Sequence, residues 1–373
     1  WYSLYMHQGV VKKINYIAEL NLPSTSAYSI HVMKMCDAFT KLGYETKLYT
    51  YSKKKSSNLF KFFNCNKFKI IGLNFFEKNN FITRIVFALK IFFIFIFKDK
   101  KQIVISRSII SGIFLSMIVE KVILEIHHEL NSFSKYLFNI TKYFNCFKKI
   151  KIIFISKNLT KKFDIKKNKF IILDDAVDLD NFNLIKNKNF FFKNTCVYCG
   201  SFTKGKGVEN ILRISRLTKN IKYHLYGDLV NSNLTIHEIK KYKNVTFKGF
   251  ARYAIIPKIL SRYNILLLPY SKKVYVRSNN IEVGRYMSPM KLFDYLASKK
   301  IIIASKLKVY SHILNKKNSI LINSDSAKKW AQKIELIINN QNKYVYLKKN
   351  AFETAKKYTW EIRVKKIINF LDV

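Results

Sequence analysis

The sequence predicts an α/β protein with two Rossmann-like domains, each a parallel sheet flanked by helices. Two stretches predict this class, because residues 13–50 and residues 195–227 both read strand, loop, helix, strand. In the first stretch, INYIAEL is followed by a Pro/Ser/Thr loop, an amphipathic segment that stops at Gly43, and TKLYTY. In the second, CVYCG, SFTKGKG, VENILRISRL and KYHLYGD follow in the same order. Such folds bind ligands at strand-to-helix loops, at the carboxyl end of the sheet.

Further apolar runs continue both sheets. Strands are expected at residues 102–106, 121–126, 151–156 and 170–173 of the first half, and at residues 245–247, 265–269, 301–304 and 319–322 of the second. The polar segment DDAVDLDNFNLIKNKN reads as a linker, and residues 343–373 read as helical with a break near Tyr358. We therefore expect a first domain over residues 1–185, a second over 186–355, and a C-terminal helix over 356–373.

The composition fits two globular domains with a core each, since 49% of the 373 residues are hydrophobic. A net charge of +45, from 68 Lys+Arg against 23 Asp+Glu, would ordinarily favour nucleic acid or an anionic membrane. The lysines are spread along the chain, with no arginine-rich arm or zinc-knuckle spacing. We expect no nucleic-acid partner. The net charge is the one feature that favours nucleic-acid binding. Attraction to an anionic membrane surface remains an alternative.

Five cysteines form an odd set without a disulfide framework, which favours a reducing compartment. Cys196 and Cys199 make a CxxC, but in a predicted strand their side chains point to opposite faces, so we interpret them as structural thiols. The run at residues 81–97, FITRIVFALKIFFIFIF, is the membrane candidate. Arg84 and Lys90 interrupt it, so we predict a buried helix in preference to one docked on a membrane surface.

The segment at residues 288–305, SPMKLFDYLASKKIIIAS, reads as a phosphate-binding helix start followed by a buried strand. Ser288 fits the N-cap and Pro289 the first helical position. The helix would then present the free N–H groups of Met290, Lys291 and Leu292 to a diphosphate. Asp294 shares that face and could accept hydrogen bonds from a ribose. The alternative is an ordinary capped amphipathic helix.

The loop at residues 200–207, GSFTKGKG, follows a strand and precedes a helix. Its backbone can approach a ligand closely, and Lys204 and Lys206 supply charge suited to a phosphate. Any strand-to-helix turn can hold glycine, so the loop alone is moderate evidence. It gains weight beside SPMKLFD, because two loops at one sheet end can converge on one pyrophosphate.

The chain strongly resembles the family 4 glycosyltransferases, retaining enzymes of the two-domain GT-B fold. The resemblance runs in order through PSTSAYSIHVMKMCDAFTKLGYE, EIHHE, ISKNL, ILDDAVDLDNF, YCGSFTKGKGVE, HLYGD, NVTFKGF, ILLLPY, SPMKLFDYLAS and YTWEIRVKKI. It implies domains that face each other across a cleft, with the C-terminal helix crossing back to the first domain.

The resemblance implies two catalytic residues, His127 beside the donor sugar and acceptor, and Lys206 on the donor diphosphate. It implies a donor-binding set of Gly200, Ser201, Lys204, Lys206, Gly227, Phe250, Ser288, Pro289, Met290, Lys291, Leu292 and Asp294. It places Ser24, Thr25 and Ser26 on the acceptor side. His127 also fits a strand-end core histidine, but we favour it over His128 for the site.

The chain departs from the family's pair of glutamates eight positions apart, since Tyr286 takes the first position and Asp294 the second. Asp178 and Asp180 form a D-x-D in the predicted linker, where we expect no metal role. The expected activity is metal-independent, retaining transfer from a UDP- or GDP-linked sugar to a glycan or lipid-linked hydroxyl, with no cofactor. It would serve surface polysaccharide or glycolipid synthesis in the cytoplasm, peripherally on the membrane. The alternative is a catalytically impaired protein that binds nucleotide sugar or glycan without turnover.

Overall fold

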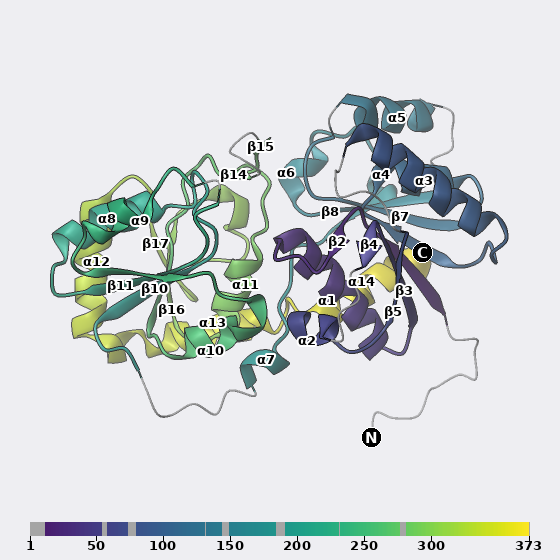
Figure 1. Cartoon of the computed structure of the whole chain (residues 1–373). Coiled ribbons are helices and arrows are strands. Elements are labelled where there is room, and N and C mark those ends of the chain that lie inside the picture. The colour runs from purple at the N-terminus through teal and green to yellow at the C-terminus, as the bar shows by residue number, and fades with distance from the viewer. Residues whose placement is uncertain are drawn as a thin grey trace, which may run out of the picture. The chain divides into compact units, whose positions relative to one another are not determined.

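The computed structural model describes residues 12–53, 58–73, 80–130, 132–143, 149–183, 191–230, 232–276 and 281–372 (Figure 1). The chain divides into two compact units. Unit 1 comprises Trp1–Phe154, Lys162–Leu173 and Trp360–Val373, and unit 2 comprises Ile155–Lys161 and Asp174–Thr359. The predicted boundary lies after residue 185, whereas the second compact unit begins its main segment at Asp174.

Unit 1 is built on a seven-stranded parallel sheet of order β5-β3-β1-β6-β7-β8-β9. Its strands are β1 (Lys13–Ile17), β3 (Glu45–Thr50), β5 (Lys69–Gly72), β6 (Ile103–Ser106), β7 (Lys121–Ile126), β8 (Ile150–Phe154) and β9 (Phe170–Ile172). Helices cover both faces of the sheet, so its central strands are short runs of Ile, Val and Leu. For example, every residue of β6 is buried.

The helices of unit 1 are α1 (Ala27–Lys41), α2 (Leu59–Phe63), α3 (Phe81–Ile96), α4 (Ile109–Ser116), α5 (Ser132–Tyr143) and α14 (Trp360–Asp372). A short pair, β2 (Asn21–Leu22) and β4 (Ser52–Lys53), and a 3-10 turn at Lys167–Lys169 complete the unit. α14 packs on α1, so the C-terminal helix belongs to the first unit, as the GT-B resemblance predicts.

Unit 2 is built on a six-stranded parallel sheet of order β12-β11-β10-β13-β16-β17. Its strands are β10 (Thr195–Cys199), β11 (Lys222–Tyr226), β12 (Val245–Gly249), β13 (Ile265–Leu268), β16 (Ile301–Ser305) and β17 (Ile320–Ile322). A separate antiparallel pair is formed by β14 (Tyr275–Val276) and β15 (Ile281–Glu282). Cys196 and Cys199 are buried in β10, and Cys146 lies outside the described residues.

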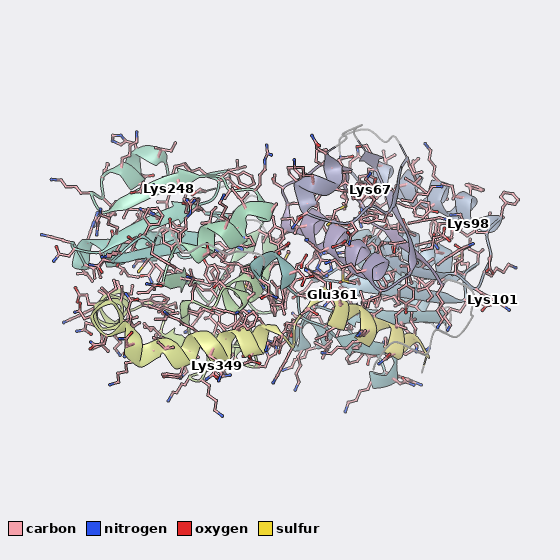
Figure 2. The ribbon with its side chains drawn as sticks, turned by 90° about the horizontal axis from the view of Figure 1, so that it is seen from below. Lys67, Lys98, Lys101, Lys248, Lys349 and Glu361 are labelled. Atoms are coloured by element: carbon pink, nitrogen blue, oxygen red, sulfur yellow. The ribbon has the colours of Figure 1, made fainter. Side chains whose placement is uncertain are left out.

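The helices of unit 2 are α6 (Lys157–Thr160), α7 (Asp180–Asn183), α8 (Val208–Leu217), α9 (Ile236–Lys240), α10 (Ile256–Ser261), α11 (Met290–Ala297), α12 (Ala327–Asn339) and α13 (Val345–Ala355). Turns of 3-10 helix lie at Tyr253–Ile255, Lys308–Tyr310 and Gln341–Tyr344. The labelled lysines in Figure 2 lie on both units, in line with a charge that is spread along the whole chain.

The predicted linker is wrong in its first part, because residues 175–178 are buried in unit 2. The N–H of Val177 donates to the Tyr358 carbonyl over 2.9 Å, and Val177 forms a parallel bridge with Thr359. Val177 belongs to the core of this unit. A polar composition concealed this segment, since Asp175 and Asp178 flank the two apolar residues that enter the core.

The prediction that residues 81–97 form a buried helix holds for one face of α3 only. That face is formed by Phe87, Ala88, Ile91 and Phe95. The exposed large apolar residues of the same run are Phe81, Ile82, Val86, Leu89, Phe93, Ile96 and Phe97. Among the described residues, no helix is long and apolar enough to cross a membrane.

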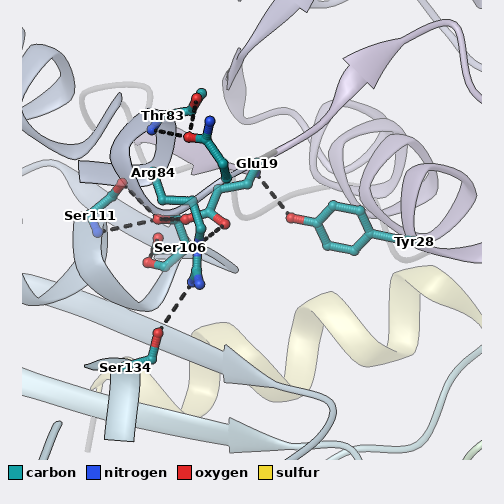
Figure 3. A network of polar contacts seen from close by, with 9 residues as sticks. Glu19, Tyr28, Thr83, Arg84, Ser106, Ser111 and Ser134 are labelled. Carbon is teal, nitrogen blue, oxygen red and sulfur yellow. Dashed lines mark hydrogen bonds and ion pairs between the residues drawn. The ribbon is translucent and has the colours of Figure 1, made fainter. Parts of the chain in front are cut away.

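Polar contacts attach the start of α3 to the body of unit 1 (Figure 3). Arg84 Nε donates to Glu19 Oε2 over 2.8 Å, and its Nη2 donates to Ser134 Oγ over 3.3 Å. Ser108 Oγ donates to the other oxygen of Glu19 over 2.6 Å. These contacts fix which face of α3 is turned outward.

Candidate functional site

The glycine-rich loop of unit 2 begins where β10 ends, at the carboxyl edge of the sheet. Gly205 and Gly207 both have φ +85°, a conformation that favours glycine. A Cβ on Gly205 would lie 2.0 Å from the Lys273 carbonyl oxygen, and one on Gly207 would lie 1.9 Å from the Pro269 carbonyl oxygen. The loop is therefore pressed against the segment that follows β13, and only glycine permits this approach.

Gly227 lies in the next loop along the sheet, after β11, and packs directly on Gly200. Its added Cβ would lie 2.1 Å from the Gly200 carbonyl oxygen. The Gly200 N–H donates to the Tyr226 carbonyl over 2.8 Å, and the Gly227 N–H donates to that of Gly249 over 2.9 Å. The loop after β11 therefore packs directly on the glycine-rich loop.

The two predicted loop lysines differ in their surroundings. Lys204 is exposed, with its Nζ 5.4 Å from the centroid of the Tyr275 ring. Lys206 Nζ lies 5.1 Å from the centroid of the Tyr270 ring, and burial lowers the pKa of Lys206 to about 8. Ser201 lies beside them, and its carbonyl accepts a hydrogen bond of 2.8 Å from the Tyr198 hydroxyl. Lys206 therefore supplies a partly buried cation close to the loop backbone.

The start of α11 differs from its predicted capping. The N-cap is Pro289, not Ser288, and the Leu292 N–H is not free because it donates to the Pro289 carbonyl over 2.9 Å. The Ser288 hydroxyl accepts from the Asp175 N–H and donates to Asp174 Oδ1, each over 3.0 Å. Met290 and Lys291 still form the first turn of a helix that starts at the same sheet edge.

Asp294 lies one turn further along α11 and is buried. Its Oδ1 accepts a hydrogen bond of 3.1 Å from the Tyr253 hydroxyl. Tyr253 directly follows the KGFAR segment, in which Phe250 is 50% exposed. The predicted ribose residue and the predicted base-bordering segment are therefore neighbours. The contact of Tyr253 with Asp294 was not predicted from the sequence.

Tyr286, in the position of the missing glutamate, is buried. Its hydroxyl donates to the Glu282 carbonyl over 2.8 Å. One oxygen of Glu282, Oε1, is buried without a hydrogen-bond partner among the described residues. Tyr286 thus has a packing role in the loop that precedes α11.

A buried carboxylate, Glu125, organises the predicted histidine site of unit 1. Its Oε1 lies 2.8 Å from His31 Nε2, 3.0 Å from His127 Nε2 and 2.5 Å from Arg363 Nη2. The Tyr16 hydroxyl donates to Oε2. Burial alone would raise the pKa of Glu125, but the charges of His31 and Arg363 and the hydrogen bonds from both imidazoles hold it well below its usual range.

His127 follows β7 directly and has 16% of its side chain exposed. Burial first, and then the charge of Arg107, lower the pKa of His127 to about 3. The imidazole is therefore neutral near pH 7. With Nε2–H donating to Glu125, its Nδ1 is left as a hydrogen-bond acceptor. His128 is exposed, and its Nδ1 lies 2.9 Å from the Glu129 carbonyl oxygen.

The acceptor-side loop forms the N-terminal cap of α1. Ser26 Oγ accepts from the Ser29 N–H over 3.2 Å, and the Ser29 hydroxyl donates to the Ser24 carbonyl over 2.8 Å. Thr25 is exposed between them. Arg107, at the end of β6, lies over the Tyr28 ring with its Cζ 4.2 Å from the centroid. Its Nη1 is buried without a hydrogen-bond partner among the described residues.

Three residues of the Glu125 cluster were missed by the sequence analysis: Tyr16, His31 and Arg363. Helical spacing holds a signal for Arg363, which lies on the buried face of α14 with Trp360 and Val364. The sequence pattern does not indicate the long-range contacts of His31 and Tyr16, because His31 lies in an ordinary amphipathic helix and Tyr16 in an ordinary buried strand.

The side chains of His31, Glu125 and His127 also place three ligand atoms within 4.8 Å of one another. In the described structure Arg363 contacts the same oxygen of Glu125, so the carboxylate already binds a cation of the protein itself. The cluster therefore fits a hydrogen-bonded anchor for His127 better than a metal site.

Comparisons with known proteins bear on the family and on the fold. Residues 181–354 match the family described as glycosyl transferases group 1. No curated protein sequence matches the chain significantly. Among solved structures, a glycosyltransferase from Rickettsia africae is 16% identical with a TM-score of 0.73, and the match covers 97% of this chain and 98% of that one.

Two other solved structures show the same fold at low identity. Anabaena HepE in complex with UDP-glucose is 12% identical with a TM-score of 0.67, over 96% of this chain and 99% of that one. WaaG, a glycosyltransferase involved in lipopolysaccharide biosynthesis, is 12% identical with a TM-score of 0.63, again over 96% and 99%. Residues 181–354 therefore match the group 1 glycosyltransferase family, and the chain with its two parallel-sheet units has the GT-B fold of these solved glycosyltransferases.

Proposed function

We propose that the chain transfers a sugar from a nucleoside diphosphate donor to a hydroxyl of a glycan or glycolipid, with retention at the anomeric carbon and without a metal. The carrying observation is Lys206, a partly buried cation in a glycine-rich loop that meets the start of α11 at one sheet edge. Backbone N–H groups and an ammonium fixed in advance can stabilise negative charge that develops on a departing diphosphate.

The identity of the donor is proposed from the site and from a structural neighbour. Asp294 beside Tyr253 offers a polar contact for a ribose, and the exposed Phe250 offers a ring for a base. HepE is described in complex with UDP-glucose, so UDP-sugars are the first donors to test. GDP-sugars are the second. Retention rests on the resemblance to the family 4 enzymes.

A thermal-shift panel of UDP-, GDP- and ADP-sugars tests donor binding. We expect one nucleotide series to raise Tm, and Lys206→Ala to remove that rise. If no nucleotide raises Tm, the proposal is wrong. Turnover is then measured as release of the nucleoside diphosphate with a glycan or lipid-linked acceptor. Binding without release for any acceptor would favour the catalytically impaired alternative, in which Tyr286 stands where an acid was expected.

We further propose that unit 1 docks on an anionic membrane through α3, where a lipid-linked acceptor would be found. The outward face of α3 carries exposed Leu89 and Phe93, and Phe97 beyond its end is 92% exposed. Exposed Lys90, Lys100 and Lys101 lie on or just after the same helix. Apolar side chains flanked by lysines fit the interface of a bilayer that contains anionic lipids. This arrangement supports a place on the cytoplasmic face of a membrane.

A further inference from the structure

The side chain of Lys291 has an unusual environment for a lysine near a helix start. Its Nζ is buried and has no hydrogen-bond partner among the described residues. It lies 3.5 Å from the centroid of the Tyr198 ring. A cation over an aromatic face is attracted to the ring. Burying an ammonium without a paired anion costs more free energy than this attraction returns, so the contact does not offset the burial.

Gly200 makes room for this ammonium. A Cβ at Gly200 would lie 2.5 Å from both Nζ and Cε of Lys291, and Gly200 has φ +145°. Gly200 is also the first residue of the glycine-rich loop, directly after β10. The ammonium of Lys291 therefore sits at the loop, although its backbone belongs to α11.

Lys206 supplies a second cation at the same place. Lys291 Nζ lies 5.2 Å from the centroid of the Tyr270 ring, and Lys206 Nζ lies 5.1 Å from that centroid. Among the described residues no carboxylate forms an ion pair with either lysine. Burial first, and then the charge of Lys206, lower the pKa of Lys291 well below its usual range, against smaller opposing effects of Cys199 and Asp294. Holding two ammonium groups around one ring without a paired anion costs free energy, and an anion between them would relieve this cost.

We infer that the ammonium groups of Lys291 and Lys206 together bind the diphosphate of the donor, so that Lys291 contacts the leaving group through its side chain. This inference rests on the proposed function. When the bond between the anomeric carbon and the phosphate oxygen breaks, its electron pair stays on that oxygen, and both ammonium groups offset the added charge. The acceptor oxygen bonds to the anomeric carbon, and its proton passes to the released phosphate oxygen.

The test compares Lys291→Met with Lys300→Met as a matched control. Lys300 follows the other end of α11. Burial lowers the pKa of Lys300 to about 8, but its Nζ donates to the Ser261 carbonyl over 2.7 Å. Calorimetry measures the affinity of each variant for UDP, GDP and ADP and for the matching monophosphates. We expect Lys291→Met to weaken binding of the preferred diphosphate roughly 10- to 100-fold, and that of its monophosphate less. Lys300→Met should bind as the wild type does.

Two further measurements separate this role from a packing role. Lys291→Met should leave Tm of the nucleotide-free protein unchanged or raise it, because the variant removes an unpaired buried charge. Wild-type binding at pH 8.5 should take up protons, measured in buffers of different ionisation enthalpy, and Lys291→Met should take up fewer. Lys291→Gln serves if the methionine variant fails to fold.

The outcomes distinguish the inference from the proposed function. If the wild type binds a diphosphate and Lys291→Met binds it equally well, the inference is overturned and the proposed function stands. A lowered Tm with an unchanged preference for diphosphate over monophosphate also overturns it, because that result describes a packing residue. If the wild type binds none of the three diphosphates, both fail.

Discussion

Arg363 donates a hydrogen bond of 2.5 Å to Glu125, so the C-terminal helix supplies the cation for a carboxylate at the end of β7. The same guanidinium donates through Nη1 to the Leu173 carbonyl over 2.5 Å. Glu125 in turn holds His127. The tail of the chain thereby positions a predicted site residue more than two hundred positions earlier in the sequence.

Replacing Arg363 with Met should lower the free energy of unfolding by about 3–5 kcal/mol, because Glu125 would keep a buried charge without its cation. Urea unfolding measures this. Arg216→Met is the control, since Arg216 is exposed on α8 over the Tyr242 ring, and we expect it to stay within about 0.5 kcal/mol of the wild type. Equal stability of the two variants would contradict the role given to Arg363.

The depressed pKa of His127 makes stability depend on pH in a defined direction. The folded protein holds this imidazole neutral down to about pH 3, whereas the unfolded chain protonates it below its usual pKa of 6.5. The unfolded state therefore binds more protons between these values, and the free energy of unfolding should fall as pH drops from 6.5 toward 3. Urea unfolding from pH 4.5 to 7.5 should show a smaller slope for His127→Gln.

His224 provides the comparison for that experiment. The pKa of His224 is lowered to about 4, first by burial. His224 therefore contributes a similar pH dependence to the free energy of unfolding of unit 2, and this contribution should remain when His127 is replaced. In an NMR titration the His127 signals should show no midpoint between pH 5 and 8. A midpoint near 6.5 would show that His127 is solvated, and the slope argument would then be wrong.

Much of the fold could be predicted from sequence because the strands are short apolar runs between turn residues. β10, β13 and β16 lie where the sequence places them to within a residue at each end. β5 was missed, since Lys69–Gly72 is brief and sits in a basic, aromatic stretch without a clear alternation. The predicted linker failed for a related reason, because polar residues on either side concealed the core residue Val177.

The candidate site was predictable where backbone chemistry sets it, as in the glycine-rich loop and at the start of α11. The site was not predictable where side chains from distant parts of the sequence form hydrogen bonds to the same atom. Ser288 has the right residue type for an N-cap, but Asp174 and Asp175 take its hydroxyl. Lys291 was predicted to act through its N–H, and only the packing of Gly200 and Tyr198 shows where its ammonium lies.

Lys206 should make nucleotide binding weaken at alkaline pH. Its folded pKa is about 8, and only the protonated amine attracts a diphosphate. The affinity for the preferred nucleoside diphosphate should therefore fall as pH rises from 7 to 9, by calorimetry at constant ionic strength. Lys206→Met should bind more weakly throughout and show a flatter dependence. An affinity that is constant across this range in the wild type would contradict a diphosphate contact by Lys206.

A substitution on the outward face of α3 should weaken membrane binding and leave nucleotide binding unchanged. Phe93 is 61% exposed, so Phe93→Glu should cost little stability while it places a negative charge against anionic lipid. Sedimentation with vesicles of phosphatidylcholine and phosphatidylglycerol measures binding, and we expect a roughly tenfold loss. Leu336→Glu is the control, since Leu336 is 46% exposed on α12 of unit 2. A docking face on α3 requires that only Phe93→Glu weakens vesicle binding, and that its affinity for nucleotide stays unchanged. An equal loss of vesicle binding in both variants would contradict this face, because it would point to general charge attraction.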